Sequence, residues 1–148
     1  MQFQKFNQNL LIIDFGSQVT KLIARRIRDL GVHSEIVTPN EVKKIKDYSK
    51  VKGIIFSGGP SSVTKSKYQN VPKHIFTKKI PILGICYGLQ LIAKLYGGKI
   101  KSSNKRREFG RTFIFKKNQS LLTKNFFSPK VAVWMSHEDA VVKLPKGF

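Results

Sequence analysis

Short apolar runs alternate with helical patterns along the chain up to Gly98, and this alternation restricts the fold more than any other feature. The apolar runs predict strands over residues 10–14, 32–37, 51–56 and 80–85. The stretches between and after them predict helices over residues 19–30, 41–48, 71–78 and 87–96. Strands and helices in this order predict an α/β fold with an open, mainly parallel sheet flanked by helices.

Glycines and apolar spacing support the two longest of these helices. Gly31 follows the first as a C-cap, and Gly97-Gly98 ends the last. In the first helix Val19, Leu22, Ile23, Ile27 and Leu30 recur on one face, and in the last Leu89, Ile92, Ala93 and Tyr96 do so. We expect these two faces to pack against the sheet.

The pattern changes after Gly98, where four strand-like stretches follow without long helices between them. They cover residues 99–101, 111–116, 131–135 and 140–144. This predicts a small antiparallel section at one edge of the sheet. We interpret residues 1–148 as a single domain that is incomplete at its C-terminus.

Basic residues dominate the charge, with 28 Lys and Arg against 8 Asp and Glu, a net charge of +20. Such a balance permits nucleic-acid binding. Most of these residues are scattered lysines, and the Arg25-Arg26-Ile27-Arg28 group falls on a predicted helix, so specific nucleic-acid binding is not expected. A non-catalytic basic module that docks on RNA or on an acidic partner remains an alternative. No membrane span or signal segment is seen, which predicts a cytoplasmic protein without a membrane partner.

The single cysteine, Cys86, excludes an intramolecular disulfide and by itself is compatible with a small buried apolar residue. Its context favours chemistry instead. The sequence Gly84-Ile85-Cys86-Tyr87-Gly88 follows an apolar strand and opens a helix, which is the spacing of a nucleophile elbow with sulfur as the nucleophile. So sharp a turn strains the nucleophile and leaves no room for a Cβ two residues away on either side.

Three consequences follow from such a turn. The Cys86 sulfur stands above the carboxyl edge of the sheet, where α/β folds bind ligands. The N-terminus of the following helix favours the thiolate. The Tyr87 N–H is directed at an oxyanion formed by attack, and the loop at Gly58-Gly59, which follows the third strand, offers further N–H donors at the same edge.

Five short motifs now resemble one known family. Gly84-Ile-Cys-Tyr-Gly-Leu-Gln90 resembles the nucleophile motif of class I glutamine amidotransferases, which have a flavodoxin-like α/β fold and a Cys-His-Glu triad. The other motifs are Asp14-Phe-Gly-Ser-Gln18, Ser57-Gly-Gly-Pro-Ser61, Arg107-Glu-Phe-Gly110 and Trp134-Met-Ser-His137. With them the chain resembles the amidotransferase domain of glutamine-hydrolysing GMP synthetases from about Leu10 to its last residue.

The resemblance implies that Cys86 takes ammonia from glutamine, leaving a thioester that water resolves to glutamate. It implies an ATP-using synthetase domain as partner, which aminates adenylated XMP to GMP. It also implies site residues of three kinds: Cys86 as nucleophile, Gly58, Gly59 and Tyr87 as the oxyanion site, and Gln90, Ser136, His137 and Asp139 as glutamine contacts. No metal is expected, and ATP and Mg²⁺ belong to the synthetase domain, because no pyrophosphatase loop or Walker motif occurs in the chain.

Two departures from the family pattern affect these expectations. The family's histidine and glutamate lie in a His-Pro-Glu motif, and the 148 residues contain none, so the chain alone is expected to be a feeble enzyme. His33 and His74 are expected to have surface or packing roles. Glu138 stands where the family usually has glycine. Another elbow-cysteine hydrolase, one that needs no such histidine, remains a further alternative.

Overall fold

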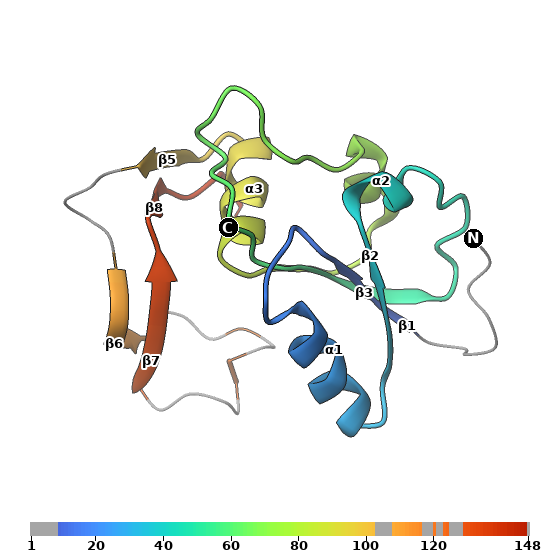
Figure 1. Cartoon of the computed structure of the whole chain (residues 1–148), viewed down its shortest axis with the longest axis horizontal. Helices are drawn as coiled ribbons and strands as arrows, with labels where there is room; N and C mark the ends of the chain where they lie inside the picture. Colours follow the sequence, from blue (N-terminus) through green and yellow to red (C-terminus); the bar gives the residue numbers. More distant parts are fainter. Residues whose placement is uncertain (1–8, 103–107, 117–119, 121–122, 125–128, 148) are drawn as a thin grey trace. The chain divides into compact units, whose positions relative to one another are not determined.

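The computed structural model (Figure 1) describes residues 9–102, 108–116, 120, 123–124 and 129–147. In chain order its elements are β1 (Asn9–Ile13), α1 (Thr20–Asp29), β2 (His33–Val37), α2 (Pro39–Val42), β3 (Val51–Phe56), the 3₁₀ helix η1 (Lys73–Lys78), β4 (Ile82–Gly84), α3 (Tyr87–Leu95), β5 (Lys99–Ser102), β6 (Glu108–Phe115), β7 (Lys130–His137) and β8 (Asp139–Lys143). They form two compact units. One consists of Met1–Lys101 and Val141–Phe148, and the other of Ser102–Ala140.

A four-stranded parallel sheet in the order β2-β1-β3-β4 is the centre of the first unit, which confirms the predicted α/β fold. Backbone hydrogen bonds continue beyond the carboxyl ends of the strands. The Ser57 N–H donates to the Ile13 oxygen at 3.0 Å, and the Ile85 N–H donates to the Phe56 oxygen at 2.9 Å. The loops that follow β1, β3 and β4 therefore leave the sheet next to one another.

Side chains on the two faces of the sheet form two separate apolar clusters, because successive strand residues point to opposite faces. Leu11 and Ile13 belong to the larger cluster, which includes Leu91 of α3, whereas Ile12 belongs to a smaller one with Ala24 of α1. Figure 1 accordingly shows α1 on one side of the sheet and α3 with α2 on the other.

The two long helices are confirmed, and their predicted apolar faces are buried in part: Ile23 and Ile27 of α1 pack against the smaller cluster, and Ile92 and Ala93 of α3 are buried. The exposed fractions of Leu22 in α1 and of Leu30 at its C-cap are 51% and 81%, while Thr20 and Ala24 are fully buried. The Thr20 hydroxyl donates to the Asp14 carboxylate at 2.8 Å, which turns this side of α1 towards β1. In α3 the side chain of Leu89 is exposed, and Leu91 joins Ile92 in the larger cluster.

The prediction of a helix over residues 41–48 is wrong, because the only helix there is α2, which ends at Val42. Thr38 and Glu41 make a capping box that begins α2 at Pro39. Beyond it the bonds join residues three apart, as in the Ile45 N–H to the Val42 oxygen at 3.2 Å. This turn places Val42 and Ile45 on the same side, and both are buried in the larger cluster together with Tyr48.

Residues 71–85 keep their predicted order with tighter local structure. The stretch predicted as a helix over 71–78 is η1, which starts after Pro72. The strand predicted over 80–85 is confirmed only for β4, because Pro81 has no N–H to donate to a ladder. The Pro81 oxygen nevertheless accepts from the Ile54 N–H at 2.9 Å, so this segment still lies along β3.

An antiparallel ribbon of β6 and β7 forms the second unit, which confirms the predicted antiparallel section. Its register runs from the Glu108–His137 pair to the Phe115–Lys130 pair. β5 and β8 pair in a separate two-stranded sheet. The prediction that residues 1–148 act as one domain stays a prediction. No helix among the described residues has the length and apolar character to cross a bilayer.

Candidate active site

Cys86 occupies a strained turn between β4 and α3. Its backbone has φ 49° and ψ −110°, outside the left-handed helical region that non-glycine residues sometimes adopt. Such a conformation costs about 1–3 kcal/mol and persists only where the surrounding structure enforces it. The residue is exposed, which excludes the role of a small buried apolar side chain. The predicted nucleophile elbow is therefore present in its geometry.

The glycines on either side of Cys86 have no space for a side chain. A Cβ on Gly84 would lie 2.6 Å from the Leu89 nitrogen, and a Cβ on Gly88 would lie 2.4 Å from the Phe56 oxygen. Real Cβ atoms do not approach backbone atoms so closely. These contacts confirm why the turn needs glycine at both positions.

The loop after β3 lies directly beside the cysteine. A Cβ built on Gly58 would be 3.6 Å from the Cys86 Cβ. The Gly88 N–H of the elbow donates to the Ser57 oxygen of this loop at 3.1 Å. The structure thus places Gly58 and Tyr87 beside Cys86, and the next residue of the loop, Gly59, contacts Phe15.

Backbone N–H groups of this cluster have no hydrogen-bond acceptor among the described residues. Within the described part of the chain, no hydrogen bond uses the N–H of Gly58, Gly59 or Tyr87. A carbonyl that accepts two such donors while sulfur attacks its carbon is stabilised as negative charge develops on oxygen. The arrangement is therefore suited chemically to acyl transfer.

The loop after β1 packs against the glycine loop. A Cβ on Gly59 would lie 2.5 Å from the Phe15 oxygen, so the two loops are in contact at backbone distance. The Asp14 carboxylate accepts from the Gly16 N–H at 2.9 Å, which shapes this turn. The Ser57 hydroxyl accepts from the Phe15 N–H at 3.0 Å. Sequence reasoning assigned no role to Ser57, although a serine between a buried strand and a double glycine was a visible signal.

Tyr87 also anchors the elbow through its side chain. Its ring lies 5.0 Å from the ring of Phe15, centroid to centroid, and its hydroxyl donates to the Gln69 oxygen at 2.6 Å. Burial raises the pKa of the Tyr87 phenol from 10.0 to about 12. The neutral phenol is thus part of the folded structure, and its bond holds residue 69 near the start of α3.

The Tyr87→Phe variant is expected to be less stable than the wild type by about 1 kcal/mol at neutral pH, because the Gln69 oxygen loses its buried donor. The raised pKa of Tyr87 also determines how this stability difference changes with pH. The wild-type advantage is complete below pH 10.0 and is lost as the pH rises towards about 12, because only the unfolded phenol ionises in that range. Urea unfolding of both proteins across this range measures it. Both carry the same lysines and other tyrosines, so a constant difference would contradict the account.

The remaining predicted site residues are on other elements. Gln90 is in α3, where its N–H donates to the Cys86 oxygen at 3.0 Å and its side chain is buried. Ser136 and His137 end β7, and Asp139 begins β8, so all three belong to the second unit with Glu138. Their roles as glutamine contacts stay predictions.

The two other histidines have ordinary structural contacts. His33 Nε2 lies 3.5 Å from a Glu35 carboxylate oxygen on β2. His74 Nε2 lies 3.4 Å from the Tyr48 hydroxyl, and the two rings meet edge to face. Packing roles predicted for both residues agree with these contacts. Among the described residues no group of three His, Cys, Asp or Glu side chains could hold a metal ion.

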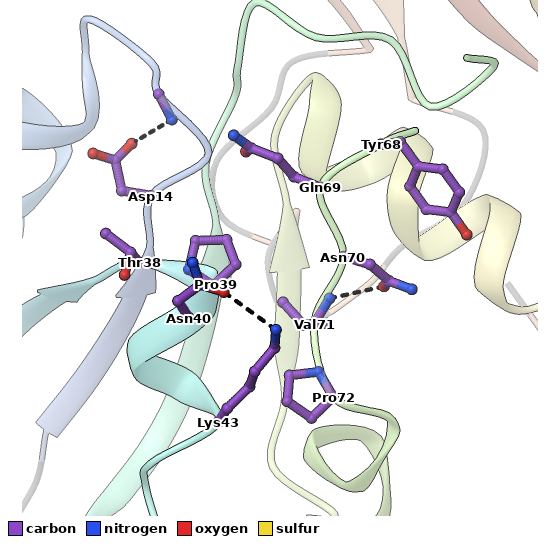
Figure 2. Close-up of a pocket in the computed structure, with 11 residues that line it drawn as sticks. Asp14, Thr38, Pro39, Asn40, Lys43, Tyr68, Gln69, Asn70, Val71 and Pro72 are labelled. Atoms are coloured by element: carbon purple, nitrogen blue, oxygen red, sulfur yellow. Dashed lines mark hydrogen bonds between the residues drawn. The ribbon is translucent and has the colours of Figure 1, made fainter. Parts of the chain in front are cut away.

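A pocket of about 920 Å³ lies between the loop after β1, the start of α2 and residues 68–72. Figure 2 shows its polar side chains, including Lys43, which donates to the Asn40 side-chain oxygen at 3.2 Å, and Asp14. Cys86 is not among the residues that line it. The pocket does not include the elbow cysteine, so we place the chemistry at the exposed elbow and not in this cavity.

Sequence comparison agrees with this geometry. Residues 11–148 match the family described as glutamine amidotransferase class-I. The chain is 49% identical over 146 residues to a GMP synthase [glutamine-hydrolyzing] of Treponema denticola, covering 99% of this chain and 28% of that protein. A protein of the same description from Macrococcus caseolyticus is 45% identical over 148 residues, with 97% and 28% covered. The chain thus spans 28% of the length of these relatives.

Solved structures show the same fold. A putative GMP synthase protein of Thermoplasma acidophilum has a TM-score of 0.81 and 27% identity, with 97% of this chain and 71% of that one covered. A glutamine amidotransferase of Thermotoga maritima has a TM-score of 0.74 at 21% identity, covering 96% and 65%. The second likeness concerns the fold alone.

Proposed function

Because this chain belongs to the class I glutamine amidotransferase family, we propose that its exposed Cys86 takes the side-chain acyl group of glutamine and releases ammonia. The observation that carries the proposal is the elbow itself. Cys86 is exposed at φ 49°, between two glycines that admit no Cβ, and 3.6 Å from the Gly58 Cβ position. Buried structural cysteines do not need such a turn.

The reaction follows from this arrangement. The Cys86 sulfur forms a bond to the amide carbon of glutamine, and the carbonyl oxygen becomes an oxyanion. The N–H groups of Tyr87 and of Gly58 or Gly59 stabilise that charge. The amide nitrogen takes up the proton lost by the Cys86 thiol and leaves as ammonia, and a thioester remains. Water then cleaves the thioester to glutamate and restores the thiol.

The relatives suggest a larger setting for this half-reaction. Those proteins are described as glutamine-hydrolyzing GMP synthases and are more than three times as long as the chain. We propose that the ammonia passes to an ATP-using synthetase domain, which aminates XMP to GMP in the cytoplasm. ATP and Mg²⁺ would act in that domain. Because the chain contains no His-Pro-Glu sequence, its own turnover of glutamine is expected to be slow.

Alkylation by a glutamine-shaped electrophile tests the proposal without requiring turnover. A diazo-ketone analogue of glutamine should add once to the chain, with the Cys86 sulfur bonded to its methylene carbon and dinitrogen released. Peptide mass mapping locates the adduct, and an excess of glutamine should slow its formation at least tenfold, because both compounds occupy the same site.

Two controls separate recognition from simple thiol reactivity. Iodoacetamide, which lacks the glutamine side chain and α-carbon, should alkylate Cys86 without the saturation expected of the glutamine analogue, and glutamine should slow this reaction too, because bound glutamine covers the sulfur. A diazo-ketone analogue one methylene shorter, matched to asparagine, should react much more slowly than the glutamine analogue. Equal rates for the two analogues, or no protection by glutamine, would disprove glutamine as the substrate.

The same experiment addresses the two alternatives, both of which family membership disfavours. Another elbow-cysteine hydrolase would show labelling without discrimination between the analogues. A non-catalytic basic module would leave Cys86 inert to the glutamine analogue and would bind RNA tightly at physiological salt, where nonspecific binding is weak.

A further inference from the structure

We propose that the Ser57 hydroxyl is a positioning group for acyl transfer at Cys86, which it supports by fixing the direction of a backbone N–H in the glycine loop. The inference rests on the proposed function, because it concerns the oxyanion site of that reaction. Ser57 itself is fully buried and does not reach the substrate.

The hydroxyl of Ser57 has a defined role as both acceptor and donor. Its oxygen accepts from the Phe15 N–H at 3.0 Å and lies 2.8 Å from the Gly58 carbonyl oxygen. The Asp14 carboxylate is farther away, at 3.5 Å, and already accepts from the Gly16 N–H and from the Thr20 hydroxyl. A hydroxyl has one proton, and the shorter contact directs it to Gly58.

The hydrogen bond from Ser57 to the Gly58 oxygen fixes the orientation of the whole peptide group. The Gly58 carbonyl and the Gly59 N–H belong to one planar peptide unit and point in opposite directions. A peptide between two glycines has unusual rotational freedom, because neither residue has a Cβ to restrict it. The bond from Ser57 removes this freedom, so the Gly59 N–H is held away from Ser57 on the other side of the loop.

The backbone of Ser57 links this peptide to the nucleophile. Its carbonyl oxygen accepts from the Gly88 N–H of the elbow at 3.1 Å, and its own N–H donates to the Ile13 oxygen at 3.0 Å. One buried residue thus connects the loop after β1, the glycine loop and the first turn of α3. Rotation of the Gly58–Gly59 peptide would remove one oxyanion donor without moving Cys86.

Acylation by an activated ester measures this donor directly. The γ-(p-nitrophenyl) ester of glutamate bonds the carbonyl carbon of its γ-carboxyl group to the Cys86 sulfur and releases p-nitrophenolate, while the thiol proton passes to buffer. The leaving group needs no protein acid. We expect the Ser57→Ala variant to acylate at least tenfold more slowly at saturation, with the half-saturating ester concentration changed less than twofold.

Ser34 offers a matched control, because it is as deeply buried and its hydroxyl donates to the Ala24 oxygen at 3.1 Å, between β2 and α1. Ser34→Ala should lower the thermal midpoint about as much as Ser57→Ala but leave acylation near the wild-type rate. Iodoacetamide gives a second readout, since alkylation forms no oxyanion. Its rate at Cys86 should be the same in all three proteins.

The possible outcomes separate the two proposals. If Ser57→Ala acylates as fast as Ser34→Ala, or loses reactivity equally towards the ester and iodoacetamide, the positioning role is disproved and the proposed function stands. If wild-type Cys86 is not acylated at all, the proposed function fails and the inference fails with it. Ser57→Gly provides a second hydroxyl-free variant should the alanine variant not fold, and the same criteria apply to it.

Discussion

Exchanging Cys86 for glycine is expected to abolish acyl transfer and, at the same time, to raise the free energy of unfolding by about 1 kcal/mol. Both effects follow from one backbone conformation. With φ 49° and ψ −110°, Cys86 is in a region that glycine adopts easily and other residues do not. The side chain is exposed, so its removal costs little packing.

The Cys86→Ala variant is the control that isolates the strain. Alanine also lacks the sulfur and should be equally inactive, but its Cβ keeps the backbone strained. The two variants should therefore differ in urea unfolding by about 1 kcal/mol in favour of glycine, after allowance for the greater chain entropy of unfolded glycine. Equal stability of the two variants would mean that the turn stores no strain.

Replacing Gly88 with alanine is expected to destabilise the fold by about 3 kcal/mol, among the largest effects of a single methyl group. The new Cβ would lie 2.4 Å from the Phe56 oxygen and 2.5 Å from the Phe56 Cβ. That oxygen cannot retreat freely, because it accepts from the Ile85 N–H at 2.9 Å. Relief of the clash must move α3 away from β3 or break the contact between β3 and β4.

Gly58→Ala tests the same reasoning with the opposite expectation. Its φ is not in the range that favours glycine, and its Cβ would meet neighbours at 3.5–3.7 Å, which is ordinary contact. This variant should stay within about 1 kcal/mol of the wild type. The methyl group would nevertheless lie beside the Cys86 Cβ and slow acylation. A reversal of the two stability results would refute the packing described for the elbow.

Local patterns were sufficient to predict most of the fold and the geometry of the elbow. The strands were found because parallel strands buried on both faces are continuous apolar runs. The elbow was predicted from five consecutive residues, because so sharp a turn leaves no space for a Cβ at either glycine. A Cβ on Gly84 or Gly88 would indeed meet backbone atoms at close range.

Long-range contacts explain what the sequence patterns missed. The buried face of α1 depends on the bond between Thr20 and Asp14, which joins a helix to a strand end. The helix predicted over residues 41–48 ended early because Ile45 and Tyr48 reach the core through turns. The bonds of Ser57 were not predicted because its partners, Phe15 and Gly88, come from segments far apart in the chain.

Acid-quenched mass mapping after mixing with the γ-ester of glutamate is the most direct measurement of whether Cys86 is an acyl-accepting nucleophile. The account predicts one γ-glutamyl group on the peptide that contains Cys86, and little or none from the matched β-ester of aspartate. Acyl groups scattered over the many lysines, with Cys86 unmodified, would contradict it.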